Sequence, residues 1–394
     1  MAHALIIGGG IAGPVTAMAL QRAGIGSTVY EAYPSGADHA GAFLVLFANG
    51  LEALAVIDAD RTVHDRSFPS GTVEFLSDTG GTLGTRPLAG SAGGPRPRTL
   101  PRSALYRALR DEATRRGIPV EYGKRLVATG TGPRGTVTAL FADGSRAEGD
   151  LVVGADGIHS RTRTLLDPTA PRPRHTGQLT VCGRTRDTGH PAPPDTYRMM
   201  YGRRGFFGCA TAPDGTTYWF ANIPGPEVPK TALAAHTPDQ WRRRVTETFA
   251  DDRTPAAAIA AATGRDIVGM NVYDLLSTPV WHDHHTVLVG DAAHATAPNA
   301  AQGASMAIED GVVLARCLRD LPAPDRAFAA YERLRRERVE RVVAMSAALA
   351  GRAARTAEER RARDAEVAAR TAGNTGGGTD WLTGYRVDWD APVR

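Results

Sequence analysis

A glycine-spaced turn at the start of the chain constrains the fold more than any other feature. Residues 4–7 form a short apolar run, and Gly8, Gly10 and Gly13 follow it in the spacing G-x-G-x-x-G. An Ala- and Leu-rich helical segment comes next, and then a second apolar run that ends at Glu31. Strand, glycine turn, helix and strand within about 30 residues predict a βαβ unit of a parallel sheet.

The residues of this turn are suited to holding a dinucleotide. The glycines let the turn tighten, let the backbone approach a pyrophosphate and let the helix pack closely on the strand. The helix N-terminus offers N–H groups and partial positive charge to the phosphates, and a carboxylate at the end of the second strand can accept hydrogen bonds from ribose hydroxyls. The pattern does not distinguish FAD from NAD(P). The predicted contacts are Gly8, Gly10, Ile11, Ala12, Gly13 and Glu31.

Two later motifs narrow the choice of cofactor. They are GADGIHSRTR at 154–163 and GDAAHATAPNAAQGASMAIEDG at 290–311. Together with the first motif, in this order and separation, the chain resembles the class A (single-component) FAD-dependent monooxygenases, the para-hydroxybenzoate hydroxylase-like family, over nearly its whole length. Three spaced motifs in the correct order are far more specific than any one of them.

The resemblance implies further contacts with FAD. An arginine in the segment LPRSAL would lean on the cofactor, and the aspartate of the second motif would lie in a turn near the pyrophosphate and the path of the nicotinamide donor. In the third motif an aspartate would accept from the ribityl chain, a proline would lie beside the isoalloxazine ring, and a helix N-terminus would stabilise negative charge on the reduced flavin. These residues are Arg102, Asp156, Asp291, Pro298, Gly303, Ala304 and Ser305.

Three departures from the family pattern bear mainly on the nicotinamide donor. Ala301 stands where the family often has the first glycine of its flavin loop, and Ser305 stands where it often has asparagine. No Arg or Lys lies between Glu31 and Asp60, a stretch in which the family often places an arginine that contacts the cofactor. FAD binding is expected to survive these changes.

The resemblance implies an enzyme that uses NADPH or NADH and O2 to hydroxylate an electron-rich small molecule, aromatic, phenolic, indole-like or polyene, through a flavin C4a-hydroperoxide. This chemistry belongs to the cofactor, so no catalytic side chain is assigned. Epoxidation or another flavin oxidation on the same fold remains an alternative, as does a flavin-binding protein that NAD(P)H does not reduce. Halogenation is disfavoured, because Ala221 replaces the second tryptophan of the halogenase pattern and neither lysine, Lys124 or Lys230, is suitably placed.

The middle of the chain predicts an antiparallel sheet that holds the substrate. Alternating apolar segments flank the turn Pro213-Asp214-Gly215, which is a hairpin pattern. Alternate residues of a strand share a face, so one face should line the substrate site. The candidates for substrate contact are Met199, Tyr201, Phe207, Cys209 and Phe220.

The predicted fold class is therefore α/β: a Rossmann-type FAD-binding domain with an inserted antiparallel substrate sheet and C-terminal helices. Single helical stretches are expected near 238–262 and over 325–372, before a break at Gly376–Gly378. The expected divisions are 1–72, 98–175 and 272–324 for the FAD-binding domain, 73–97 and 176–271 for the substrate domain, and 325–394 for the helical region.

Composition argues against several other classes. The formal net charge is only +4, and basic residues usually have acidic neighbours, so a nucleic-acid partner is not expected. No run of 18 apolar residues occurs, and the N-terminus lacks a signal-peptide pattern, so we expect a cytoplasmic protein with no membrane partner, either a monomer or a homodimer.

The cysteines and histidines suggest no metal site. The three cysteines are far apart in the sequence and lack metal-ligand spacing. His282, His284 and His285 lie on one expected turn and should not converge on an ion. His294 in the third motif is expected to be a structural, hydrogen-bonded histidine rather than a base.

Overall fold

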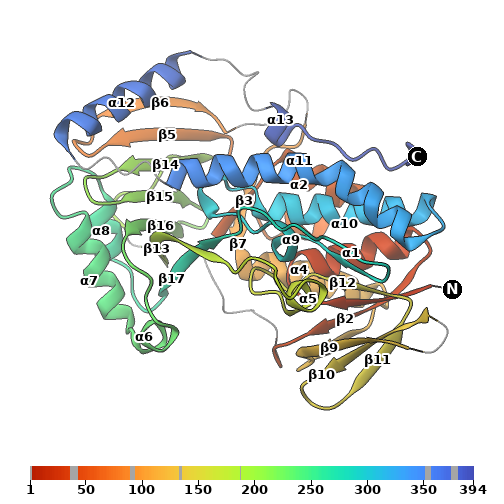
Figure 1. Ribbon diagram of the computed structural model, residues 1–394. Coiled ribbons are helices and arrows are strands. Elements are labelled where there is room, and N and C mark those ends of the chain that lie inside the picture. The colour runs from red at the N-terminus through yellow and green to blue at the C-terminus, as the bar shows by residue number, and fades with distance from the viewer. Residues whose placement is uncertain are drawn as a thin grey trace.

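The computed structural model describes residues 2–35, 43–88, 94–132, 135–186, 188–350, 356–373 and 380–394. It contains two large sheets, with α11 (Pro324–Ala350) extending from one to the other (Figure 1). The Gly376–Gly378 break and part of the 73–97 segment lie outside the described residues. No helix within the described ranges combines the length and apolarity needed to cross a lipid bilayer.

The first sheet is parallel and contains the predicted βαβ unit. Its five strands run in the order β18-β12-β1-β2-β8, and every neighbouring pair is parallel. Such a sheet is buried on both faces, which explains its near-continuous apolar strands. The strands are β1 (His3–Ile7), β2 (Gly26–Glu31), β8 (Val120–Tyr122), β12 (Leu151–Gly154) and β18 (Thr286–Leu288).

Different layers cover the two faces of the parallel sheet. One core joins the sheet to four main helices, to α11 and to parts of shorter helices, and a second core joins its other face to a small antiparallel sheet. Burial on both sides fixes the loops that leave the carboxyl ends of the strands. The helices are α1 (Ala12–Arg22), α2 (Ala48–Val56), α4 (Arg102–Arg115) and α10 (Gly303–Asp320), and the small sheet comprises β9 (Leu126–Thr131), β10 (Val137–Phe141) and β11 (Arg146–Gly149).

The second large sheet has seven strands in the order β17-β13-β16-β15-β14-β5-β6. The predicted hairpin is confirmed as β15 and β16. The sheet is antiparallel apart from β14 and β5, which pair in parallel. Its strands are β5 (Thr72–Ser77), β6 (Thr82–Pro87), β13 (Arg174–Thr185), β14 (Thr196–Tyr201), β15 (Phe206–Thr211), β16 (Thr217–Pro224) and β17 (Ile267–Asp274).

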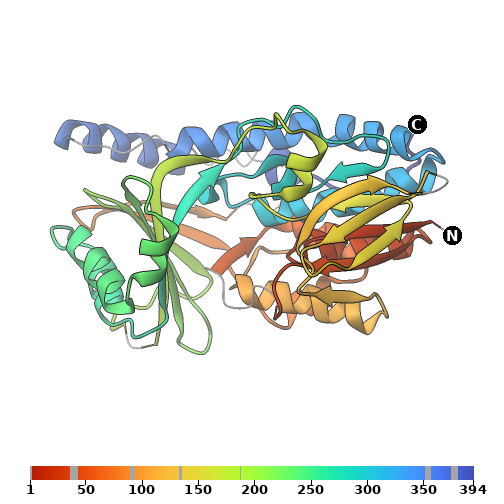
Figure 2. The same cartoon turned by 60° about the horizontal axis from the view of Figure 1, so that its bottom comes forward.

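Two predicted helical stretches are interrupted. The 238–262 stretch forms α7 (Pro238–Thr248) and α8 (Ala256–Ala261), which pack on the outer face of the mixed sheet after α6 (Lys230–Ala235). A proline at the N-cap of α8 explains the interruption, since the residue before proline disfavours helical backbone. The 325–372 stretch forms α11 and α12 (Ala357–Ala372), which lie along one edge of the molecule (Figure 2).

Short elements connect these layers. A three-stranded sheet in the order β3-β7-β4 packs against the mixed sheet. The short elements are β3 (Phe43–Leu46), β4 (Phe68–Pro69), β7 (Arg98–Pro101), α3 (Asp60–His64), α5 (Arg161–Leu166), α9 (Asp291–His294), a 3-10 turn at Pro298–Ala300 and α13 (Asp380–Thr383).

Candidate functional site: a dinucleotide cradle facing an aromatic sheet

The glycine turn after β1 leaves room at one position and is tightly packed at the other two. A Cβ at Gly8, where φ is +112°, would lie 2.4 Å from the carbonyl oxygen of Ala155. A Cβ at Gly13 would lie 1.9 Å from the carbonyl oxygen of Gly8. At Gly10 a Cβ would meet nothing within 4 Å. Packing thus requires glycine at two of the positions, whereas Gly10 borders open space into which a ligand can fit.

The helix that follows the turn has unsatisfied donors. Ile11 is the N-cap of α1, no side chain caps the helix, and no acidic residue lies in its first turn. The first N–H groups of a helix have no intrahelical acceptor, so those at Ala12 and Gly13 can donate to a phosphate. Glu31, only 8 % exposed, accepts from the N–H groups of Gly9 at 2.7 Å and Tyr33 at 2.9 Å. Glu31 therefore holds the glycine turn in place through these two hydrogen bonds.

The DG motif forms a tight turn that packs against this loop. Asp156 accepts from the backbone N–H groups of Arg161 at 2.8 Å and Thr162 at 2.9 Å, and from the Ser160 hydroxyl. Gly157 has φ of +76°, a conformation that favours glycine. Asp156 thus fixes the DG turn and the start of α5, and a direct contact between its carboxylate and a cofactor stays a prediction.

Arg163 joins the DG turn, at Asp156 and Gly157, to residues 290–294 of the third motif, called the GD loop below; the sequence did not predict this role. Its side chain is 1 % exposed and donates to the carbonyl oxygens of Ala292 at 2.9 Å and Ile158 at 2.7 Å. Burial lowers the pKa of its guanidinium. The motif contains Arg161 and Arg163, and only the fold shows which of them is buried.

The GD loop lies between helices α1 and α10. A Cβ at Gly290 would lie 3.2 Å from the Cβ atoms of both Ala12 and Ala307, and one at Gly303 would lie 4.0 Å from Oδ1 of Asp291. The half-buried Asp291 therefore lies beside the start of α10.

Arg102, at the start of α4, places a cation near Asp291. Its Nε donates to the Tyr106 hydroxyl at 2.6 Å. The side chain remains solvent-accessible although protein surrounds it. Tyr106 is the main cause that raises the pKa of Arg102, and Asp291 raises it further, against the opposing effect of burial.

The segment before α10 combines an exposed proline with a strained residue. Pro298 is exposed at the start of the 3-10 turn, and Ala301 has φ of +52°. An L-residue in this left-handed region costs about 1–2 kcal/mol, which explains why the family often has glycine here. Gln302 provides no side-chain cap to α10, so the first N–H groups of the helix, at Gly303 and Ala304, lack intrahelical acceptors.

The side chain of Ser305 points away from the open side of this segment. It is fully buried, and a Cβ at Gly50 of α2 would lie 2.7 Å from its Oγ. Only the backbone N–H of Ser305 could therefore serve a ligand. Three features form what is called the cradle below: the open space at Gly10, two uncapped helix N-termini and the accessible Arg102 guanidinium. Together they fit a dinucleotide such as FAD, which carries a pyrophosphate and a flavin that becomes anionic on reduction.

A buried charge network holds the GD loop in place. Asp310 of α10 accepts from the N–H of Gly290 at 2.9 Å and from Nε2 of His294, and it pairs with Nε of Arg335 at 2.7 Å. Burial raises the pKa of Asp310, but His294 and Arg335 lower it by more, so the net pKa is well below its usual range. Arg335 also pairs with Glu309 at 2.6 Å. The prediction that His294 is a structural, hydrogen-bonded residue is confirmed.

One face of the mixed sheet, called the inward face below, is turned toward β3. In this face Val73, Tyr197 and Ala210 pack against Val45 and Phe47. The inward face also carries three of the predicted substrate residues, since Met199 pairs with Gly208, which pairs with Phe220, and Tyr201 pairs with Phe206. Its half-buried side chains include Phe75, Met199, Tyr201, Phe206, Tyr218 and Phe220.

The prediction is wrong for Phe207 and Cys209. Both are fully buried on the opposite face, where Phe207 stacks on Trp219 at 5.3 Å and contacts Phe249 of the α7 layer. Alternation along β15 therefore points Phe206 and Gly208, not Phe207 and Cys209, toward the inward face. The sequence shows two alternating sets, and only the helix packing shows which set is covered.

An aromatic residue outside the predicted set faces the same strands. The ring of Phe43, at the start of β3, lies 5.9 Å from the rings of Tyr218 and Phe220. Next to it, Phe206 lies 6.0 Å from Phe220. In the described residues no three His, Cys, Asp or Glu side chains converge as a metal site. The inward face is thus an aromatic surface without a metal centre in the described part of the chain.

A cofactor cradle at the carboxyl ends of a parallel sheet, combined with a mixed sheet that presents aromatic side chains, fits a flavoprotein oxidoreductase. Comparison with known proteins agrees. Residues 1–346 match the family described as "FAD binding domain". The aurachin C monooxygenase/isomerase of Stigmatella aurantiaca is 31% identical over 339 residues, which cover 84% of this chain and 85% of that protein.

Two further relatives point the same way. The 3-amino-4-hydroxybenzoate 2-monooxygenase PtnB3 of Streptomyces platensis is 32% identical over 341 residues, with 84% and 83% of the two chains covered. The crystal structure of Klebsiella pneumoniae HpxO with FAD and uric acid has a TM-score of 0.85 and 26% identity, and covers 96% of this chain and 95% of that one. The chain belongs to the class A FAD-binding monooxygenase family, and it is an FAD-dependent NAD(P)H monooxygenase.

Proposed function

We propose that this enzyme hydroxylates an electron-rich aromatic small molecule that binds on the inward face of the mixed sheet. The observation that carries the proposal is a group of three aromatic rings, in which the centroids of Phe43 and Phe206 lie 5.9 Å and 6.0 Å from that of Phe220. Aromatic rings pair with other rings in offset or edge-to-face arrangements. The named substrates of the relatives include aromatic and heterocyclic compounds, which supports the same class.

The residues of this chain would act by binding and positioning. Gly10 and the N–H groups of Ala12 and Gly13 would hold the FAD pyrophosphate, Asp291 would accept from the ribityl chain, and the start of α10 would face the flavin pyrimidine edge. The chemistry that FAD would supply when bound and reduced is the activation of O2. The rings of the inward face would orient the substrate and exclude water, which would limit side reactions of the activated oxygen.

The same reasoning gives a division of labour along the chain. We propose that 1–72, 98–175 and 272–324 bind FAD, that 73–97 and 176–271 bind substrate, and that 325–394 support both. The network of Asp310 and Arg335 fits the supporting role, because it joins the GD loop to α11.

Isotope labelling tests the proposed function. The enzyme would be incubated with NADPH or NADH and a panel of phenols, indoles and aromatic acids under ¹⁸O₂, and the products would be analysed by mass spectrometry. We expect one ¹⁸O atom in a hydroxylated ring and one NAD(P)H consumed per product. Label in an epoxide would favour the epoxidase alternative. Flavin that NAD(P)H never reduces, with any panel member, would favour a flavin-binding protein without this activity.

A further inference from the structure

A strip of half-buried apolar side chains continues along the inward face beyond Phe220. Phe206 lies 5.1 Å from Tyr201, which stacks on Phe75 at 6.1 Å, measured between ring centroids. In the register, Met199 of β14 lies opposite Gly208 of β15 on one side and Phe75 of β5 on the other. From β16 to β5 the strip crosses three strand spacings, or about 14 Å. This length exceeds that of a single aromatic ring.

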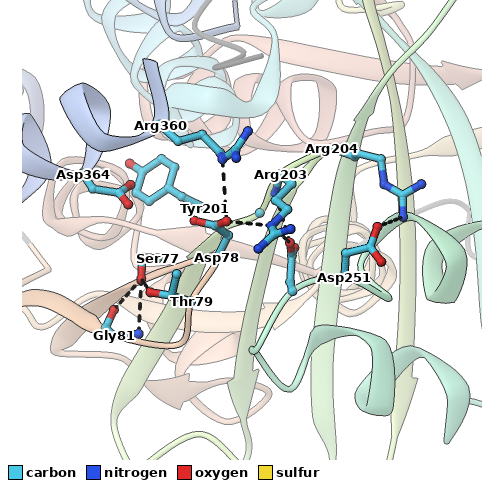
Figure 3. A network of polar contacts seen from close by, with 12 residues as sticks. Ser77, Asp78, Thr79, Gly81, Tyr201, Arg203, Arg204, Asp251, Arg360 and Asp364 are labelled. Atoms are coloured by element: carbon cyan, nitrogen blue, oxygen red, sulfur yellow. Dashed lines mark hydrogen bonds and ion pairs between the residues drawn. The ribbon is translucent and has the colours of Figure 1, made fainter. Parts of the chain in front are cut away.

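Helix α12 closes the outer end of the strip. Arg363 of α12 lies over the Tyr201 ring at 5.0 Å and donates to the Tyr201 carbonyl oxygen at 3.2 Å. At the same end of the helix, Arg360 pairs with Asp78 at 3.6 Å, and Arg203 reaches the same carboxylate at 2.9 Å (Figure 3). These contacts join α12 to the edge of the mixed sheet.

Among the described residues, one arginine at this edge of the sheet has no carboxylate partner. Arg86 of β6 is opposite Val73 in the register and so shares the inward face. Its guanidinium carbon is 5.6 Å from the centre of the Phe75 ring. Across the described ranges it makes no ion pair with a carboxylate. The Arg86 side chain is exposed and so open to a ligand. Partial desolvation by the surrounding protein lowers the pKa of its guanidinium, and so does the nearby Arg370, while Tyr201 raises it.

The acidic residues near this edge of the sheet are paired with other arginines and do not balance the charge of Arg86. Arg363 is paired with Asp364 at 2.8 Å. Arg370 is 3.7 Å from Glu366, and both side chains are 53% exposed; ion pairs so exposed to solvent are weak. Within the part of the chain that the structure describes, Arg363 and Arg370 each have an acidic neighbour, whereas Arg86 has none.

We propose that Arg86, with Arg370 beside it, forms an outer subsite that binds the carboxylate of an aromatic substrate whose rings lie along the strip from Phe75 to Phe220. The proposal rests on the proposed function and narrows its substrate class to aromatic acids, with room for more than one ring. A guanidinium recognises a carboxylate through parallel N–H donors, and the adjacent rings would cover the apolar part of the substrate.

The test uses pairs of compounds that differ in charge but hardly in shape. Oxidised holoenzyme would be titrated with 4-hydroxybenzoate and 4-hydroxybenzamide, with 4′-hydroxybiphenyl-4-carboxylate and its amide, and with a three-ring pair, while the visible flavin spectrum reports binding. The variant is Arg86→Gln. The control is Arg204→Gln, because Arg204 is an exposed arginine paired with Asp251 at 3.0 Å at the turn between β14 and β15.

We expect the native enzyme to bind at least one acid about tenfold more tightly than its amide, which corresponds to about 1.4 kcal/mol. Arg86→Gln should abolish that preference and leave amide binding unchanged, and Arg204→Gln should retain it. The absence of any pair in which the native enzyme prefers the acid overturns the proposal. So does an equal loss for acid and amide in Arg86→Gln.

A second measurement separates the substrate from the electron donor, which also carries anionic groups. The rate of anaerobic flavin reduction without substrate, as a function of NADPH concentration, should be the same for the native enzyme and Arg86→Gln. A raised half-saturating NADPH concentration, with acid binding unchanged, would assign the cluster to the donor instead. Failure of the proposed function would appear differently, as no labelled product from any compound.

Discussion

Replacing Gly10 by alanine should weaken FAD binding without destabilising the fold. A Cβ at this position meets no protein atom within 4 Å, and the backbone φ is not in the left-handed region. The change in unfolding free energy of the FAD-free protein should therefore stay within about 0.5 kcal/mol. In the complex the methyl group would occupy space that the pyrophosphate needs.

The expected loss follows from the hydrogen bonds that the displaced phosphate would forfeit. One hydrogen bond to a charged group contributes about 1.5–3 kcal/mol, so the FAD dissociation constant should rise by about 10- to 150-fold. Gly130→Ala is the matched control: its Cβ also meets nothing within 4 Å, but it lies in β9. Gly13→Ala should instead destabilise the fold itself, because its Cβ would lie 1.9 Å from a carbonyl oxygen.

Two assays check these expectations. Titration of FAD-free protein, followed by flavin fluorescence, gives the dissociation constant, and urea unfolding followed by circular dichroism gives stability. Gly130→Ala should match the native protein in both. If Gly10→Ala binds FAD as tightly as the native protein, the pyrophosphate does not approach Gly10, and the assignment of the cradle is refuted.

Three other substitutions test separate parts of the structure. Gly208→Ala should weaken substrate binding and leave FAD affinity unchanged, because its Cβ would lie 2.4 Å from the Phe220 ring; titration with each ligand checks this, and unchanged substrate binding would contradict it. Asp310→Asn should cost about 3–5 kcal/mol at pH 7. Burial raises the folded-state pKa of Asp310, but His294 and Arg335 lower it by more, so the net pKa is lowered. The destabilisation by Asp310→Asn should therefore shrink as the pH falls below about 4. A difference in unfolding free energy that stays constant with pH, measured by urea unfolding, would contradict this. Ala301→Gly should stabilise the protein by about 1 kcal/mol by relieving a φ of +52°, and a lower urea midpoint would count against that strain.

Local patterns carried most of the information about the fold. The βαβ unit and the hairpin of β15 and β16 follow from short-range rules, since both depend on neighbouring residues and turn glycines. The parallel pairing of β5 with β14 could not be predicted, because it joins residues more than 100 positions apart. Helix α2 was missed for a local reason: Asn49 and Gly50 near its start have low helix propensity, and burial against α10 compensates for it.

The site was predictable where a motif fixes backbone and not where side chains meet over long distances. The glycine turn was predicted correctly as the link between a strand and a helix. The contact of Arg163 with the carbonyl of Ala292 joins residues 129 apart, and nothing local indicates it. The wrong orientation of Phe207 and Cys209 has a similar cause, because the covering helix α7 follows later in the chain and decides which face is buried.

The most direct test of the central claim is the visible spectrum of the purified enzyme under anaerobic conditions, before and after addition of NADPH and then NADH. The account predicts oxidised-flavin bands that bleach on addition of a nicotinamide donor, and that bleach faster when an aromatic substrate is present. A protein that shows no flavin bands, even after FAD is added, would contradict the account.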